Sequence, residues 1–157
     1  NNGSEIRGAG YAAVFSPTSR YVYTSSIYPG RLFRYDLSSG NNTTIKNSER
    51  FIGKTNCAER PGTGIAGGSC QATSYHPLEE GGGQVLRGPD GKMYVADRSA
   101  PWISVVDHPD ASSGTTSAQT AVNVGWRHGG LPLPGGALSY YGLPQMVSLY
   151  TPRFIQY

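Results

Sequence analysis

One pattern constrains the fold of this chain more than any other: an eight-residue stretch recurs farther along it. Residues 16–23 are SPTSRYVY, and residues 88–95, which lie 72 positions later, are GPDGKMYV. Both copies place proline at the first corner of a turn, where its fixed φ suits a type I turn, and both begin the next strand with a basic residue. An internal repeat of this kind predicts a fold assembled from copies of one supersecondary unit.

Short strands separated by turns make up each copy. The chain contains 22 Gly and 11 Pro, which disfavour helix interiors and mark turns. Tyrosine, with 11 copies, suits sheets that have one wet face. The predicted strands are Tyr11–Phe15, Arg20–Thr24 and Arg31–Leu37 in the first copy, and Gln84–Arg87, Lys92–Ala96 and Trp102–Val106 in the second. We therefore predict an all-β chain with about two propeller-like blades and an irregular C-terminal segment.

Three regions follow from this pattern. Residues 1–46 form the first blade-like repeat, and residues 84–157 form the second repeat with the terminal segment. A period of 72 exceeds a blade of about 40–50 residues, so residues 47–83 are assigned to a Gly-rich insertion between the repeats.

Four shorter stretches complete the expected secondary structure. Thr43–Ile45 and Ala121–Val124 are predicted to be short strands, and one irregular strand is expected around Phe51 and Ile52. Residues 129–136, GGLPLPGG, are predicted to have no regular structure because of their breakers.

The two cysteines of the chain, Cys57 and Cys70, lie within the Gly-rich insertion. A disulfide across such a loop would stabilise the fold by about 3 kcal/mol on the loop-closure model. Two free thiols are the alternative, and a zinc site would need further ligands from a chain with only three histidines. We favour the disulfide, which indicates an oxidising compartment.

Charge and hydropathy exclude two classes of partner. The net charge is +3, and the basic residues are scattered rather than gathered into a nucleic-acid-binding stripe. No apolar run approaches the length of a membrane span. Charged residues make up 15% of the chain, below the usual quarter or so, and a surface of uncharged polar groups favours an extracellular setting.

Three segments of the second half resemble a known family when taken together and in order. They are residues 86–96 (LRGPDGKMYVA), residues 103–110 (ISVVDHPD) and residues 141–147 (YGLPQMV). They resemble the closing blades of the propeller-like region of large secreted surface proteins of gliding bacteria. His108 and Gln145–Met146 depart from the usual residues of that pattern. The resemblance implies a blade-like fold and an extracellular or cell-surface location, and it implies no particular chemistry.

The histidines and acidic turns give no motif for catalysis or for a cofactor. His76, His108 and His128 all lie in turn contexts, and no pair has the spacing of a helical zinc motif. Asp107 and Asp110 with His108 could gather around a cation, but an Asp-x-x-Asp after a strand is more often a turn that caps its own backbone. We therefore predict no metal and no catalytic residue.

Five residues remain as candidates for ligand binding. Asp97 and Arg98 follow a strand end, where propellers place side chains that face the central channel; an exposed ion pair is the alternative. Trp126, Arg127 and His128 place an aromatic ring beside hydrogen-bond donors in a Gly-rich stretch. The tyrosines could stack on sugars, but Tyr21 and Tyr23 share one strand face, and packing of that face is the simpler interpretation.

The predicted function is a non-catalytic extracellular structural, adhesive or interaction module. Two blades cannot close a ring of about four or more, so the open edges must pack on other protein chains or further copies of this one. Carbohydrate is a second candidate partner. The rival function is a lyase or hydrolase on a propeller scaffold with an acidic metal site, which would require several inward carboxylates from a chain with only ten acidic residues.

Overall fold

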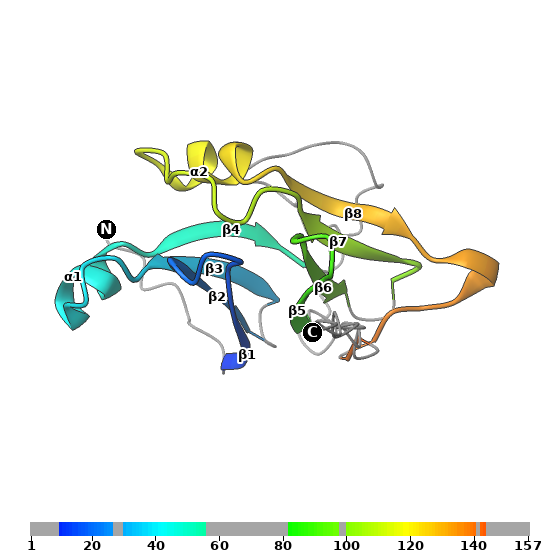
Figure 1. The fold of residues 1–157 in the computed structure, drawn as a ribbon. Coiled ribbons are helices and arrows are strands. Elements are labelled where there is room, and N and C mark those ends of the chain that lie inside the picture. The colour runs from blue at the N-terminus through cyan, green and yellow to red at the C-terminus, as the bar shows by residue number, and fades with distance from the viewer. Residues whose placement is uncertain (1–9, 27–29, 56–81, 98–99, 141, 144–157) are drawn as a thin grey trace, which may run out of the picture.

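The chain forms two four-stranded antiparallel sheets, each with its strands in sequence order (Figure 1). This computed structural model describes residues 10–26, 30–55, 82–97, 100–140 and 142–143. The first sheet contains β1 (Gly10–Phe15), β2 (Tyr21–Ser26), β3 (Arg31–Asp36) and β4 (Arg50–Lys54). The second contains β5 (Gly82–Arg87), β6 (Met93–Asp97), β7 (Trp102–Val106) and β8 (Trp126–Pro132). The prediction of a mostly β chain is confirmed.

The repeat seen in the sequence is present as a repeat of structure. β1 and β5 begin at Gly10 and Gly82, and β2 and β6 begin at Tyr21 and Met93, so both pairs keep the offset of 72 residues. In each sheet a short helix lies between the third and fourth strands: α1 (Asn42–Asn47) in the first and α2 (Ser117–Asn123) in the second. Each unit is therefore a strand meander with one helix before its last strand.

Both helices replace short strands that the sequence predicted, so those two predictions are wrong. Thr43–Ile45 lies in α1, whose N-cap Asn41 accepts a hydrogen bond from the Thr44 amide at 3.0 Å. Ala121–Val124 lies at the end of α2, whose N-cap Thr116 accepts one from the Gln119 amide at 3.1 Å. An apolar run this short fits a strand or a helix equally well. Here the N-cap side chains stabilise the helix.

The Gly- and Pro-rich stretch after Trp126 also differs from its prediction. β8 continues to Pro132, and a 3₁₀ turn, η1, follows at Pro134–Gly136, so part of residues 129–136 has regular structure. β8 is the last strand of its sheet and bonds to a neighbour on one side only. Edge strands tolerate Pro and Gly that a central strand would exclude. The prediction of no regular structure, which rested on the Gly and Pro residues, is therefore wrong for residues 129–132 at this sheet edge.

The fourth strand of the first sheet comes from the range assigned to the insertion. β4 includes Phe51 and Ile52, where an irregular strand was expected, and it pairs with β3 through a register shift beside Leu32. Cys57 and Cys70 lie outside the described residues, so their predicted disulfide stays a prediction.

The two sheets enclose one core, and they do so with equivalent faces. Tyr21 and Tyr23 of β2 are fully buried on the inner face of the first sheet, as predicted. Their counterparts at the offset of 72, Met93 and Val95 of β6, are fully buried in the same core. The same side of each unit therefore points inward.

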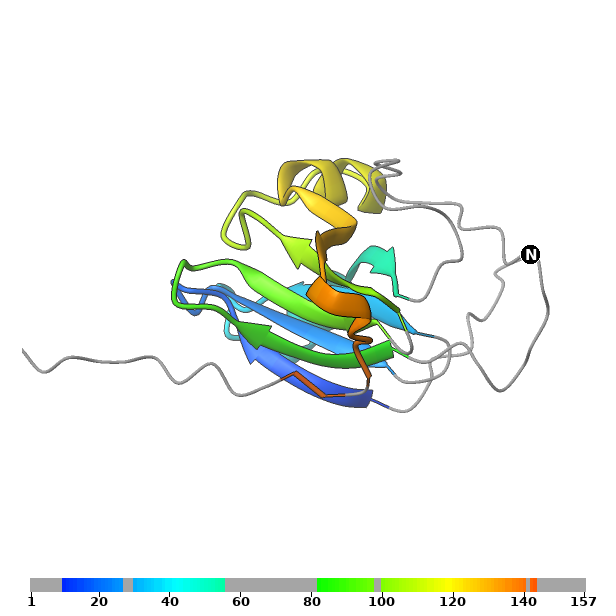
Figure 2. The same ribbon diagram turned by 90° about the vertical axis from the view of Figure 1, so that its right-hand side faces the viewer.

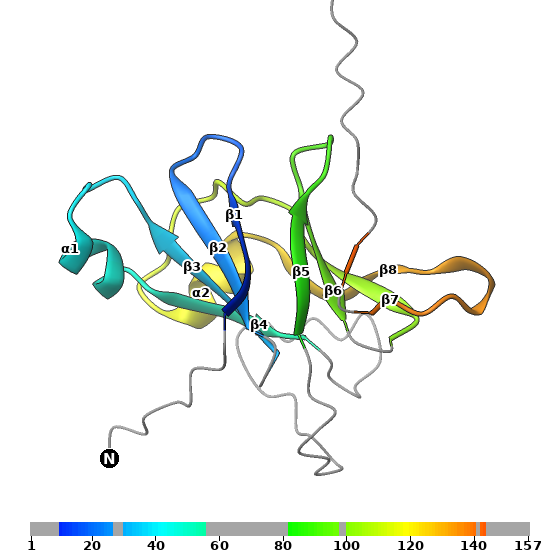
Figure 3. The same ribbon diagram turned by 90° about the horizontal axis from the view of Figure 1, so that it is seen from below.

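The two units also run in the same direction. β1 lies beside β5, with the hairpins β1–β2 and β5–β6 at the same end of the molecule (Figure 3). α2 covers one side of the core, where it packs on β4 (Figure 2). Because the inner faces of both sheets line one core, the outer face of each sheet points away from the other sheet.

The two repeated hairpin turns share one left-handed backbone position that is occupied by different residues. Ser19 adopts a left-handed conformation with φ of 61°, and Gly91, its counterpart, has φ of 80°. Because a Cβ makes this conformation cost about 1–2 kcal/mol, Ser19→Gly is expected to raise the free energy of unfolding by up to about 1 kcal/mol, after subtracting the added backbone entropy of glycine. Urea unfolding would measure it. The reciprocal variant Gly91→Ser should be destabilised, and a loss of stability in Ser19→Gly would contradict the argument.

Candidate functional site

The structure brings two of the predicted site residues together through a serine. The Ser104 hydroxyl, on β7, donates to the Asp97 carboxylate at 2.7 Å and lies 3.2 Å from Nδ1 of His128 on β8. The amide of Gly129 also donates to the Ser104 oxygen. Because the single hydroxyl proton goes to Asp97, a proton on Nδ1 of His128 best satisfies the remaining contact.

This arrangement contains the residue types of a hydrolase triad in a different order. In a triad the histidine takes the serine proton and the carboxylate orients the histidine. Here the serine lies between the two other groups, donates directly to the carboxylate and is itself fully buried. The cluster ties β6, β7 and β8 together and does not place a hydroxyl where a substrate could reach it.

The same cluster fixes the segment that follows η1. The Asp97 amide donates to the Ser139 hydroxyl at 2.9 Å, and that hydroxyl donates back to the Asp97 carbonyl. The Ser139 amide bonds to the Ala100 carbonyl at 2.7 Å. Asp97 thus holds a distant part of the chain against the second sheet, a role that its position after a strand did not reveal.

The other predicted binding residues lie apart from this cluster. Trp126 is only 6% exposed and packs against Gly53, so the ring that the sequence offered as a ligand-binding candidate is buried in the core. Arg127 is exposed and forms a two-point ion pair with Asp107, at 2.5 and 2.9 Å. Arg98 lies outside the described residues. Trp126 is buried and Arg127 is exposed because neighbouring side chains of a strand point to opposite faces.

Asp107 is the most strongly ion-paired carboxylate at this end of the second sheet. Hydrogen bonds from Arg127 and then Lys92, whose Nζ lies 2.8 Å from the carboxylate, lower its pKa to about 2. A carboxylate with a depressed pKa stabilises the fold above its unfolded pKa of about 4, and that contribution is lost as the pH falls towards about 2.

We expect the Asp107→Asn variant to lose less stability than the native chain between pH 4 and pH 2 (about the unfolded and folded pKa of the carboxyl group). Denaturant unfolding at several pH values would measure the slope. Arg127→Gln removes the first hydrogen-bond partner of Asp107 and should likewise reduce the loss of unfolding free energy between pH 4 and pH 2 (about the unfolded and folded pKa of the carboxyl group). Equal slopes in all three proteins would contradict this assignment.

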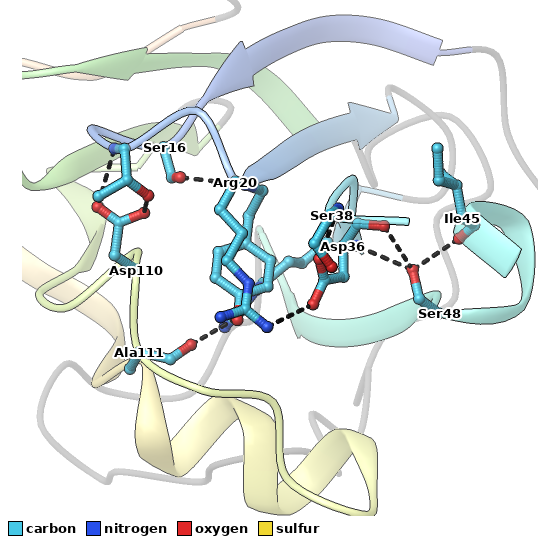
Figure 4. Close-up of polar contacts among 11 residues, drawn as sticks. Ser16, Arg20, Asp36, Ser38, Ile45, Ser48, Asp110 and Ala111 are labelled. Atoms are coloured by element: carbon cyan, nitrogen blue, oxygen red, sulfur yellow. Dashed lines mark hydrogen bonds and ion pairs between the residues drawn. The ribbon is translucent and has the colours of Figure 1, made fainter. Parts of the chain in front are cut away.

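A buried arginine joins the first sheet to the loop after β7. Arg34 lies on the inner face, with its guanidinium carbon 3.4 Å from the centre of the Tyr21 ring, and it donates to the Ala111 carbonyl at 2.5 Å. Close by, Asp110 accepts from the Thr18 amide at 3.1 Å and from its hydroxyl at 2.5 Å (Figure 4). The Tyr23 hydroxyl donates to the Pro109 carbonyl at 2.9 Å. These contacts fix loop 107–111 over the first sheet.

On its far side the first sheet carries a surface that we call the aromatic face. Its members, by the strand register, are Phe15, Val22, Thr24, Phe33, Tyr35 and Phe51, with Ala13 opposite Thr24 and the charged Arg31 and Lys54 paired on the same side; Tyr11 lies at the bulge near the start of β1. Phe15 and Tyr35 are both paired with Val22, and Phe33 is paired with Thr24 and Phe51, which places them on one face. Phe15 is 55% exposed and Tyr11 43%. The Phe33 and Phe51 rings are 5.7 Å apart.

The corresponding face of the second sheet is covered by the chain itself. Ala96 and Ile103 form a second apolar cluster with Leu143, against which Leu133 also packs. Both leucines belong to the segment that Ser139 anchors. One outer face is therefore covered from within the chain, whereas Phe15 of the aromatic face stays exposed. Local alternation does not reveal this face, because within residues 31–35 it is Arg34 that points into the core while Phe33 and Tyr35 point outward.

Two further properties concern the described residues. Among the described residues, no three His, Cys, Asp or Glu side chains gather as metal ligands would. No helix within the described ranges is long and apolar enough to cross a membrane. Comparison with family models, curated proteins and solved structures gives no match to this chain.

Proposed function

We propose that this chain is a non-catalytic extracellular module, structural or adhesive, that binds other protein chains through its aromatic face. The observation that carries the proposal is the contrast between the two outer faces: Leu133 and Leu143 of the same chain pack on one, whereas Phe15 is 55% exposed on the other. Contiguous exposed apolar side chains on a folded protein mark interaction surfaces. Protein is favoured over carbohydrate because the most exposed ring of this face, Phe15, has no polar group for sugar hydroxyls.

The extracellular setting is part of the same proposal. It is supported by the low share of charged residues, by the Cys57–Cys70 pair in a Gly-rich stretch and by the resemblance of the second half to secreted surface proteins. Each four-stranded meander also has the size and order of a propeller blade. The like-to-like packing of the two units makes the pair a self-contained core with outer faces available for partners.

Phe15→Lys tests the proposal because it places a charge at the most exposed ring of the aromatic face. We expect association of the chain, measured by light scattering over a range of micromolar concentrations, to weaken at least about tenfold, which corresponds to about 1.4 kcal/mol. Val122→Lys is the matched control, since Val122 is 58% exposed on α2, away from this face. Equal association of the two variants and the native chain would refute a role for the aromatic face.

A further inference from the structure

The covered face of the second sheet shows how an extended segment binds such a surface. Leu133 and Leu143 supply the apolar contacts. Backbone amides of the same segment bond at the margin of the sheet: Leu133 to the Pro101 carbonyl at 2.9 Å and Leu143 to Oε1 of Gln84 at 3.0 Å. Apolar side chains on the face and amide bonds at its edge therefore suffice to hold a Gly- and Pro-rich segment.

The chain continues beyond this point with a segment of similar chemistry. Residues 144–157 are PQMVSLYTPRFIQY, which contains seven large apolar or aromatic side chains and a single charged one, Arg153. Fourteen residues span up to about 50 Å when extended. This length is ample to cross a four-stranded sheet, whose strands lie about 4.8 Å apart.

The position of Leu143, where this segment begins, indicates whether the segment binds the aromatic face of its own molecule or that of a second copy. Leu143 is packed on the outer face of the second sheet, and the aromatic face is the outer face of the first sheet, on the opposite side of the core. The segment therefore begins on the side of the core away from the aromatic face of its own molecule, and it would have to pass around both sheets to reach that face.

We propose that residues 144–157 of one copy bind the aromatic face of a second copy, an inference that rests on the proposed function of that face. The interface is heterologous, because a tail on one molecule meets a sheet on the next. Each added copy then presents a new free tail or a new free face, so association continues as an open series rather than stopping at a dimer.

Two variants that each remove one half of the interface test this directly. The truncation lacking residues 144–157 keeps the aromatic face, and Phe15→Lys keeps the tail. We expect the native chain to form a series of species that grows with concentration in native mass spectrometry, and each variant alone to be monomeric. An equimolar mixture of the two variants should form a one-to-one heterodimer. Val122→Lys should retain the full series.

Other outcomes overturn the inference in distinguishable ways. If the truncation still dimerises and Phe15→Lys does not, the aromatic faces pair with each other; the proposed function then stands and the tail is not the partner. If the mixture forms no heterodimer, the tail does not bind the face.

A synthetic peptide of residues 144–157 keeps the test valid if the truncated chain folds poorly. The peptide should bind the 157-residue chain at concentrations where that chain is mostly monomeric, followed by fluorescence anisotropy of a label on the peptide, and Phe15→Lys in the 157-residue chain should weaken that binding at least about tenfold. Equal binding to both chains would also refute the inference.

Discussion

Gly53→Ala is expected to lower the free energy of unfolding by about 3 kcal/mol, the upper part of the range for overpacking a core. A Cβ at Gly53 would lie 2.2 Å from the Trp126 indole nitrogen and 2.3 Å from the adjoining ring carbon. The indole cannot yield easily, because it is buried in the core between the two sheets. Denaturant unfolding followed by tryptophan fluorescence would measure the loss.

The matched control is Gly10→Ala, because a Cβ at Gly10 meets nothing within 4 Å. Gly10 also lies in a strand of the first sheet, and its substitution should change stability by less than about 0.5 kcal/mol. A double variant identifies the cause: Gly53→Ala should cost much less in a Trp126→Leu background, where the clashing ring is gone. Additive effects of the two substitutions would show that contact between these residues is not responsible.

Arg34→Lys is expected to destabilise the chain by more than about 2 kcal/mol, whereas Arg34→Met should cost far less. Among the described residues no carboxylate lies within ion-pair distance of Arg34; the Tyr21 ring and the Ala111 carbonyl contact its guanidinium, and Asp110 acts on its charge from farther away. A planar guanidinium can stack on a ring, but a strongly hydrated ammonium cannot do so and would remain buried. Methionine removes the buried charge while filling much of the space.

The order of stability, native chain or methionine variant above lysine variant, distinguishes stacking from charge as the role of Arg34. Urea unfolding of the three proteins gives this order. A lysine variant as stable as the native chain would mean that a positive charge alone is sufficient at this position. The exposed Arg20, which pairs with Asp36 at 3.0 Å, provides a control, because Arg20→Lys should be almost neutral.

The strands and their turns could be predicted from local sequence. Ser16–Ser19 and Gly88–Gly91 specify two turns by their own residues, and the strands on either side follow from the alternation of side chains. The helix α2 had a usable signal that the prediction passed over: Thr116 and Gln119 have the spacing of a capping box, and Gly125, with φ of 64°, follows the C-cap.

The candidate site was less accessible from sequence because its contacts join distant strands. Asp97 and His128 were singled out, but their connection runs through Ser104, which has no distinguishing neighbours in the chain. The burial of Trp126 depends on Gly53, more than 70 positions earlier. The two outer faces become distinct only when like faces of the units have met in one core, and no local pattern encodes that choice.

The like-to-like core has a consequence for how the molecule can be divided. A proteolytic cut between Thr55 and Gly82 would leave each fragment with a complete sheet, and no ladder of strand hydrogen bonds would cross the cut. Each fragment would also carry the buried face that the other requires. The two halves should therefore reassociate as separate polypeptides, because each supplies contacts that the other lacks, such as the Ala111 carbonyl for Arg34.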